Sequence, residues 1–208
     1  GFGRPWKDVF PEGRGHQRRQ LKRMEAVLEP LYDAYQTQLA NRNEIDFEDM
    51  LNLASEHVRK GQYVHSYRYV IVDEYQDLSR SRFELLRSLR GSKDYRLFCV
   101  GDDWQSIYRF NGCDVSYILD FERYWGPSAI CRIERTYRFS GELLEKSSDF
   151  ISRNGRQYSK QLIGTADRNS RVYPLFAPTE HEIRQRIADV LMKIPNGKEI
   201  LFLGRYNH

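Results

Sequence analysis

Short apolar runs alternate with helical patterns along most of this chain, and that alternation limits its fold more than any other feature. The β-rich runs lie at 67–72, 96–100, 129–134, 171–176 and 199–203. The helical patterns between them lie at 80–90, 141–154 and 179–194. Several of the runs are apolar without alternation, which is typical of parallel strands buried on both faces. The pattern therefore predicts an α/β sandwich whose parallel sheet is covered by helices on both sides.

An α-helical segment precedes the alternating region. Apolar residues from Leu21 to Leu39 recur every three or four positions, which is the period of one helical face. Pro30 lies inside that pattern and predicts a kink or a break. Asp46 is then expected to cap a second helix that continues through Val58 and ends at Gly61.

Composition and length exclude several classes of protein. The 208 residues leave room for one domain or slightly more, and 40% hydrophobic residues suffice for a core. The apolar runs are far shorter than the ~20 residues of a membrane-spanning helix, so we expect no membrane insertion. Three widely spaced cysteines and five unpaired histidines predict neither a disulfide framework nor a structural zinc, and they favour a reducing, cytoplasmic location. The excess of Lys and Arg over acids at 4–23 could contact phosphates.

Two neighbouring carboxylates follow the first apolar run. Ligands of open parallel sheets collect at the carboxyl ends of the strands, and Asp73 and Glu74 come directly after Val72. One aspartate beside nucleotide phosphates is a typical protein ligand of Mg²⁺, and a neighbouring glutamate can orient or deprotonate an attacking water. The alternative is that Asp73 and Asp77 only cap the helix that follows Ser79.

A second set of polar and aromatic residues follows the next run. Gly101 lets the backbone turn, and Gln105 offers an amide that could contact a phosphate. Tyr108, Arg109 and Phe110 form an aromatic and basic cluster. Aromatic rings stack on unpaired bases and contribute about 1–3 kcal/mol each, while arginine binds the backbone. Taken singly, such rings lie more often in a core.

Three segments in order resemble the motifs of superfamily 1 DNA helicases of the UvrD/Rep type. They are Asp-Glu-Tyr-Gln-Asp at 73–77, Val-Gly-Asp-Asp-Trp-Gln-Ser-Ile-Tyr-Arg-Phe at 100–110 and Glu-Arg-Thr-Tyr-Arg-Phe-Ser at 134–140. They are similar to motif II, motif III and the Asn-Tyr-Arg-Ser-like box of that family. The resemblance runs from about residue 40 to the end. It implies a partial RecA-like domain of the P-loop NTPase fold, a three-layer sandwich around a parallel sheet, with an α-helical N-terminal segment.

The same resemblance implies roles for individual residues. Asp73 would hold Mg²⁺, and Glu74 would activate the hydrolytic water. Gln105 would contact the γ-phosphate of ATP and couple it to DNA. The cluster Tyr108, Arg109 and Phe110 would line the track of the single strand.

Two arginines further along the chain have less specific signals. Arg138, in the Tyr-Arg-Phe box, would support the nucleotide side of the cleft, and a structural ion pair is an equal alternative. Residues 200–205 are similar to motif IV, whose arginine approaches the γ-phosphate. Arg205 is that residue, with a surface arginine at a strand end as the alternative. Gly204 departs from the family, which usually has an adenine-stacking aromatic residue there.

The sequence contains no phosphate-binding loop of the form Gly-x-x-x-x-Gly-Lys-Ser/Thr. Two interpretations follow. In the first, the chain is part of an ATP-dependent, nucleoid-associated helicase that translocates on single-stranded DNA to duplex junctions, and this part is inactive alone. In the second, it is a non-catalytic domain that binds single-stranded DNA. A start without Met and an end directly after a strand favour the first. We then expect residues 1–43 to belong to an inserted subdomain, 44–197 to the first RecA-like domain and 198–208 to the first strand of the second.

A third interpretation belongs to a different class of enzyme. A phosphoesterase could use Asp73, Glu74 and Asp77 to hold its catalytic metal ions and would need no ATP.

Overall fold

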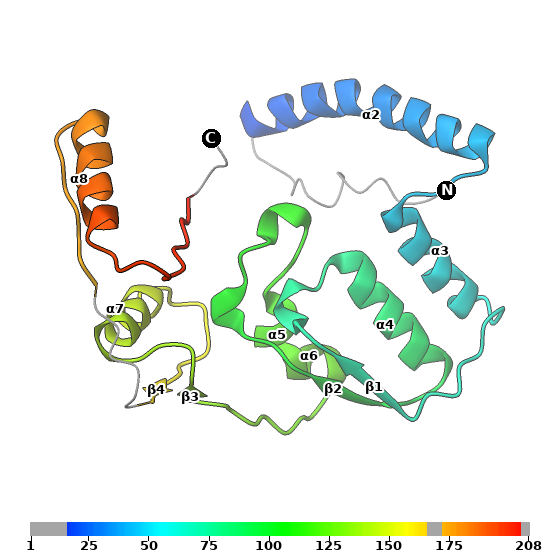
Figure 1. Cartoon of the computed structure of the whole chain (residues 1–208). Coiled ribbons are helices and arrows are strands. Elements are labelled where there is room, and N and C mark those ends of the chain that lie inside the picture. Colours follow the sequence, from blue (N-terminus) through cyan, green and yellow to red (C-terminus); the bar gives the residue numbers. More distant parts are fainter. Residues whose placement is uncertain (1–15, 166–171, 205–208) are drawn as a thin grey trace. The chain divides into compact units, whose positions relative to one another are not determined.

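In the computed structural model of this chain, which describes residues 16–165 and 172–204, the helices and strands divide into two units (Figure 1). One unit holds the residues up to Cys131 together with Arg156–Tyr158, and the other holds the rest. The larger elements of the first unit are α2 (His16–Arg42), α3 (Phe47–Arg59), β1 (Tyr69–Val72), α4 (Arg80–Ser92), β2 (Arg96–Cys99), α5 (Ser116–Leu119) and α6 (Phe121–Trp125). The described residues of this unit also form three short 3₁₀ turns, η1 (Tyr75–Asp77), η2 (Asp103–Gln105) and η3 (Arg109–Asn111). The second unit contains β3 (Arg135–Thr136), α7 (Gly141–Ile151), β4 (Ile163–Gly164) and α8 (Glu180–Met192).

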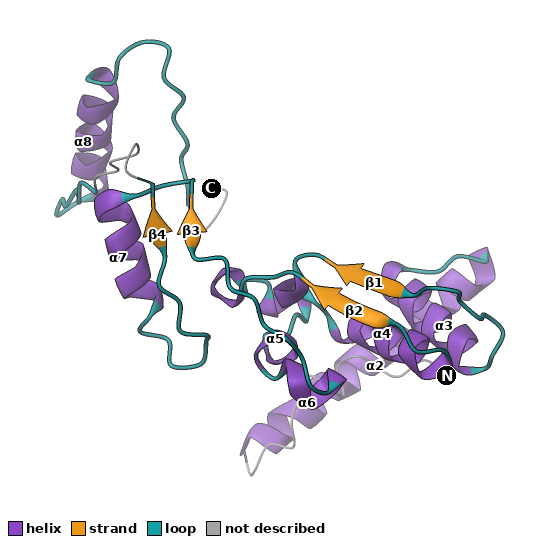
Figure 2. Cartoon of the chain, turned by 90° about the horizontal axis from the view of Figure 1, so that it is seen from below, coloured by secondary structure: helices purple, strands orange, loops and turns teal. Residues whose placement is uncertain are grey.

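The strands β1 and β2 pair in parallel, and α4 connects them (Figure 2). Parallel strands need such a crossover because the chain must return to the starting edge. The register places Val72 opposite Cys99. Backbone bonds continue beyond the strands, since Val100 donates to the Val72 carbonyl at 2.8 Å and Tyr75 donates to the Val100 carbonyl at 2.9 Å. The loops that follow the two strands therefore begin side by side.

The core of the first unit is largely aromatic. Its buried members are Tyr75, Leu78, Phe83 and Tyr117. The Phe83 ring stacks on Tyr117 with 4.1 Å between centroids, and the Trp125 indole N–H donates to the Tyr75 hydroxyl at 2.7 Å. Such ring pairs contribute about 0.5–1.5 kcal/mol beyond the area they bury. This core joins α4, α5 and α6 to the turn that follows β1.

The predicted cap of α3 is confirmed. The Asp46 side chain accepts a hydrogen bond from the Asp49 N–H at 2.7 Å, and its other oxygen accepts one from the Tyr35 hydroxyl at 3.1 Å. Gly61 follows the helix with φ +70°, a backbone conformation that glycine adopts readily. The helix packs along α4 (Figure 1), so it braces the connection between the two strands.

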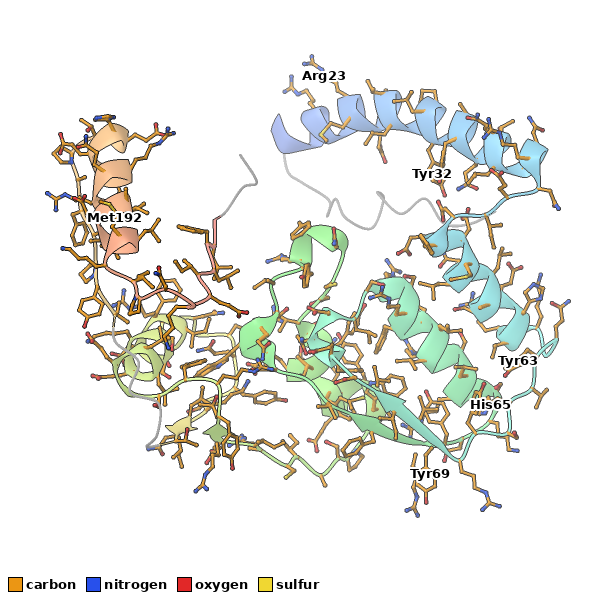
Figure 3. The ribbon with its side chains drawn as sticks, viewed as in Figure 1. Arg23, Tyr32, Tyr63, His65, Tyr69 and Met192 are labelled. Atoms are coloured by element: carbon orange, nitrogen blue, oxygen red, sulfur yellow. The ribbon has the colours of Figure 1, made fainter. Side chains whose placement is uncertain are left out.

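A buried histidine fastens the link from α3 to β1 onto α4 (Figure 3). His65 Nε2 donates to the Leu89 carbonyl at 2.8 Å, and its Nδ1 accepts from the Tyr67 N–H at 3.2 Å. Its ring also stacks on that of Tyr67 with 5.0 Å between centroids. The entry to β1 is thus fixed before the strand begins.

The described residues of the first unit cover one face of the sheet and not the second face that the sequence pattern predicted. Tyr69, Ile71 and Phe98 are 65%, 72% and 62% exposed, and Figure 3 shows Tyr69 projecting away from α4. The alternate residues Val72 and Cys99 pack against the core. The unbroken apolar runs predicted two buried faces, but the described helices of this unit pack on one face only.

Three predicted strands are also wrong. Among the described residues, 129–134, 172–176 and 199–203 contain no strand, and residue 171 lies outside the description. The second unit instead pairs β3 with β4 in parallel over two residues each. A strand forms only where a partner satisfies its backbone groups, and apolar composition does not provide that partner.

The predicted helical leader forms, but a break at Pro30 does not. The helix α2 continues from His16 to Arg42 with Pro30 inside it, and it is gently curved in Figure 1. A proline removes one backbone hydrogen bond, which an otherwise continuous helical pattern on both sides can tolerate. No helix in the described ranges has both the length and the apolar character needed to cross a bilayer.

Replacing Phe83 with alanine should lower the free energy of unfolding by about 3–5 kcal/mol, because this 2%-exposed ring sits in the aromatic core. The matched change Phe98→Ala lies on the open face of β2 and should cost less than about 1 kcal/mol. Urea unfolding followed by circular dichroism measures both. Equal losses would mean that the open face is covered in solution.

Candidate functional site

The carboxylates of Asp73 and Glu74 lie exposed at the end of β1. Glu74 adopts the left-handed conformation, with φ 49° and ψ 45°, which is uncommon for a residue other than glycine. Asp73 Oδ1 accepts a hydrogen bond from the Glu74 N–H at 2.9 Å, while Oδ2 accepts none from the described residues. Ser79, rather than Asp73 or Asp77, is the N-cap residue of α4. The capping alternative therefore does not explain Asp73.

Gln76, which the sequence reasoning assigned no role, lies at the centre of this edge. Its side chain is only 2% exposed. The amide nitrogen donates to Glu74 Oε2 at 2.9 Å, and the amide oxygen accepts from the Asp102 N–H at 2.9 Å. One buried amide thus joins the two loops. The signal available in the sequence was a glutamine two residues after the acidic pair, but its partner 26 residues away gave no local sign.

The loop after β2 continues the same chain of hydrogen bonds. Asp102 Oδ1 accepts from the Trp104 N–H at 3.1 Å, and Oδ2 accepts from Gln105 Nε2 at 2.7 Å. Gln105 is exposed. The structure therefore brings the predicted residues Glu74 and Gln105 to one edge of the sheet, connected through Gln76 and Asp102. Asp102 is a second residue that the sequence reasoning missed.

Gly101 occupies a position with no space for a side chain. A Cβ there would lie 2.8 Å from Gln76 Oε1, 3.1 Å from the Tyr75 nitrogen and 3.1 Å from Ile118 Cδ1. Gly101 therefore permits close packing in addition to the turn predicted from the sequence. The loop approaches the buried amide as closely as the backbone allows.

The aromatic cluster lies on the surface, so the alternative that these rings are core residues is wrong. Phe110 is 80% exposed and Tyr108 is 44% exposed. Their ring centroids are 6.0 Å apart with planes tilted by 52°. Arg109, also exposed, begins the turn η3 between them. Two open rings beside a guanidinium suit stacking on unpaired bases.

Tyr158, far along the chain, fixes the loop that carries Asp103 and Trp104. The Tyr158 N–H donates to Asp103 Oδ2 at 2.7 Å, and the Trp104 indole N–H donates to the Tyr158 carbonyl at 3.2 Å. The Tyr158 hydroxyl donates to the Ile118 carbonyl at 3.0 Å. No local pattern could have identified this clamp, because Tyr158 lies 55 residues after Asp103.

The two predicted arginines lie outside the described part of the first unit. Arg138 belongs to the second unit, where its backbone N–H donates to Thr136 Oγ1 at 3.3 Å. Arg205 lies outside the described residues. Their predicted contacts with nucleotide remain predictions.

The described residues contain no group of three or more His, Cys, Asp or Glu side chains placed to hold a metal ion. The three carboxylates of the phosphoesterase alternative, Asp73, Glu74 and Asp77, are thus not assembled as a ligand set. One exposed aspartate fits the different case in which Mg²⁺ takes most of its ligands from water and phosphate. Burial raises the pKa of the Cys99 thiol to about 12, which disfavours the thiolate that a nucleophilic cysteine needs.

A family model described as "UvrD/REP helicase N-terminal domain" matches residues 7–125 of this chain. The chain belongs to the UvrD/Rep helicase family. Similar proteins include DNA helicase IV of Escherichia coli, 32% identical over 88% of this chain and 26% of that protein. The putative ATP-dependent DNA helicase YjcD of Bacillus subtilis is 30% identical over 80% of the chain and 23% of that protein. DNA helicase II of Rickettsia typhi is 35% identical over 67% and 22%.

The resemblance to the UvrD/Rep family seen in the sequence motifs is therefore confirmed. The matched region begins well before residue 40, where the motif resemblance began. The chain spans about a quarter of the length of the curated relatives it matches.

Replacing Gly101 with alanine should lower the free energy of unfolding by about 1–3 kcal/mol, because the new methyl group would overlap the buried Gln76 amide. The control Gly91→Ala lies in α4, where an added methyl group would meet no atom within 4 Å, and it should be neutral or stabilise by up to about 1 kcal/mol. Thermal unfolding of both variants gives the comparison. A Gly101→Ala protein as stable as the control would show that this loop has more room than described.

Proposed function

We propose that this chain works as part of a longer ATP-driven helicase that moves along single-stranded DNA. The observation that carries the proposal is the hydrogen-bonded edge of the sheet, where the exposed carboxylates of Asp73 and Glu74 lie beside the loop of Gln105. The family assignment and the greater length of the relatives support the same proposal. Residues 44–197 would form the distal part of a three-layer RecA-like domain, and residues 1–43 would belong to an inserted subdomain.

The residues of this edge would divide the work of hydrolysis among them. Bound Mg²⁺-ATP supplies the phosphoryl group that is transferred to water. Asp73 would hold the ion through its exposed carboxylate, and Glu74 would orient the water and accept its proton. Gln105 would contact the γ-phosphate through its amide nitrogen, which carries two N–H groups and donates one of them to Asp102. Arg138 and Arg205 would supply positive charge on the nucleotide side.

The exposed aromatic cluster would bind the DNA strand. Tyr108 and Phe110 would stack on successive bases, and Arg109 would bind phosphate. These rings lie three and five residues after Gln105 in the chain. A short segment thus connects the proposed nucleotide contact to the proposed DNA contact.

The 208 residues alone should turn over little ATP. Their sequence contains no phosphate-binding loop, so neither the backbone cradle nor the lysine that binds the β- and γ-phosphates is present. Hydrolysis is therefore proposed for the full-length protein, and the experiments below use it.

Glu74→Gln in the full-length protein should reduce the kcat of DNA-stimulated ATP hydrolysis at least about 100-fold, because an amide cannot accept the proton of the attacking water. Phosphate release measures turnover, and titration with a fluorescent nucleotide should show that binding survives. The control Glu48→Gln changes an exposed carboxylate in the first turn of α3 and should leave both unchanged. Undiminished turnover in Glu74→Gln would remove this residue from the reaction.

The double variant Tyr108→Ala/Phe110→Ala should weaken single-strand binding by about 2 kcal/mol or more, since each stacked ring contributes about 1–3 kcal/mol. Fluorescence anisotropy with a labelled oligo(dT) at two salt concentrations measures the affinity. The control Tyr69→Ala/Phe98→Ala removes two similarly exposed rings from the open face of the sheet. Equal affinity in both double variants would place the DNA track elsewhere.

A further inference from the structure

We propose that Gln76 is a positioning residue that ties the orientation of the Glu74 carboxylate to the conformation of the loop at 101–105. The inference rests on the proposed role of Glu74. It adds a buried residue that would touch neither the attacking water nor the nucleotide and would act through its hydrogen bonds to Glu74 and Asp102.

The partners of the amide determine its orientation. The Asp102 N–H can only donate, so it must face the amide oxygen, and the Glu74 carboxylate can only accept, so it must face the amide nitrogen. Turning the amide by half a turn would set donor against donor and acceptor against acceptor. Gln76 can therefore satisfy both loops in one arrangement only.

The surroundings leave the amide little room to turn. The side chain is 2% exposed, and the site of a Cβ on Gly101 lies only 2.8 Å from its oxygen. The Ser106 hydroxyl also donates to the main-chain carbonyl of Gln76 at 3.5 Å, so the loop after β2 contacts the backbone of this residue as well. Solvent does not reach the amide to replace a lost partner, so the two hydrogen bonds depend on each other.

A shift of the loop would therefore reach Glu74. The Asp102 carboxylate accepts a hydrogen bond from Gln105, and the Asp102 N–H donates one to Gln76. A movement of Gln105 that shifts Asp102 would therefore also strain the hydrogen bond between Asp102 and the buried amide. Glu74 has an exposed and backbone-strained position, and within the described structure the Gln76 amide donates a hydrogen bond to its carboxylate. Loss of that bond would free the carboxylate to rotate.

Two variants of Gln76 in the full-length protein test this inference. Gln76→Glu keeps the shape and the acceptor for Asp102 but loses the donor to Glu74, and Gln76→Met keeps the approximate size but loses both groups. Each should lower the kcat of DNA-stimulated ATP hydrolysis about 10- to 100-fold, because a misplaced catalytic group loses this much rate. The KM for ATP should stay within about threefold, since Gln76 makes no proposed contact with nucleotide.

The pH profile separates positioning from a general loss of structure. In Gln76→Glu the introduced carboxyl is buried beside Glu74 and Asp77 of the same turn, with Asp102 on the neighbouring loop. Burial and these like charges raise its pKa, and its protonated form can donate to Glu74 as the amide did. The ratio of variant to wild-type kcat should therefore rise as the pH falls. The same ratio for Gln76→Met should stay flat.

The chain offers a matched control for the charge change. Gln36 also donates from its amide nitrogen to a carboxylate, Asp49 Oδ2 at 3.2 Å, but at the junction of α2 with α3. Gln36→Glu should leave kcat and its pH profile at the wild-type values. The inference is overturned if both Gln76 variants keep kcat within about twofold of wild type, or if the Gln76→Glu ratio is flat with pH.

A second measurement does not require the Gln76 variants to fold. Amide hydrogen exchange at Asp102 should become about threefold faster or more in Glu74→Ala than in wild type, because the Gln76 amide nitrogen loses its 2.9 Å bond to Glu74 and keeps only the longer 3.4 Å bond to Asp77. Unchanged exchange would contradict the coupling. If Glu74→Gln retains turnover, the proposed function fails. If Glu74→Gln is inactive while the Gln76 variants behave as wild type, this inference alone fails.

Discussion

Parallel pairing of β1 with β2 sets the position of the candidate site, because both strands end at the same edge of the sheet. The ladder of backbone bonds continues past the strands, from Val72 through Val100 to Tyr75. These bonds hold the beginning of one loop against the beginning of the other. The side chains that follow need only short-range contacts to meet, even though the two segments lie far apart in the sequence. The acidic pair and the Gln105 loop come together for this reason.

A buried amide between two loops stabilises a structure only when both of its ends are paired. An unsatisfied buried donor or acceptor costs about 1–3 kcal/mol, while a satisfied one contributes modestly. Gln76 meets this condition through Glu74 and Asp102. An apolar side chain of similar size would fill the space but would favour no particular offset between the loops. The amide therefore contributes specificity more than stability, and Gly101 makes its close approach possible.

Local chemistry was sufficient to predict the elements whose signals lie within a few residues. Asp46 capped the helix expected to follow it, and the two strand ends carried the predicted polar residues. The bond from Asp102 to Gln76 could not be predicted, because no local pattern specifies a partner 26 residues away. Residues 199–203 have the composition of a strand but no pairing partner among the described residues. The exposure of Ile71 could not be predicted either, since an apolar run does not specify which elements cover it.

Glu74 has a strained backbone conformation that its neighbours stabilise through hydrogen bonds. A left-handed residue other than glycine costs about 1–2 kcal/mol and persists only where its neighbours hold it. Here Asp73 accepts from the Glu74 N–H, Tyr75 is tied to Val100, and Gln76 holds the carboxylate. The left-handed conformation at Glu74 ends the extended path of β1, and the residues that follow it enter the core. A carboxylate held this way is exposed to a ligand yet restricted in its orientation, which a base for an attacking water requires. The left-handed backbone therefore sets the direction of the Glu74 side chain, and the three contacts stabilise this strained conformation.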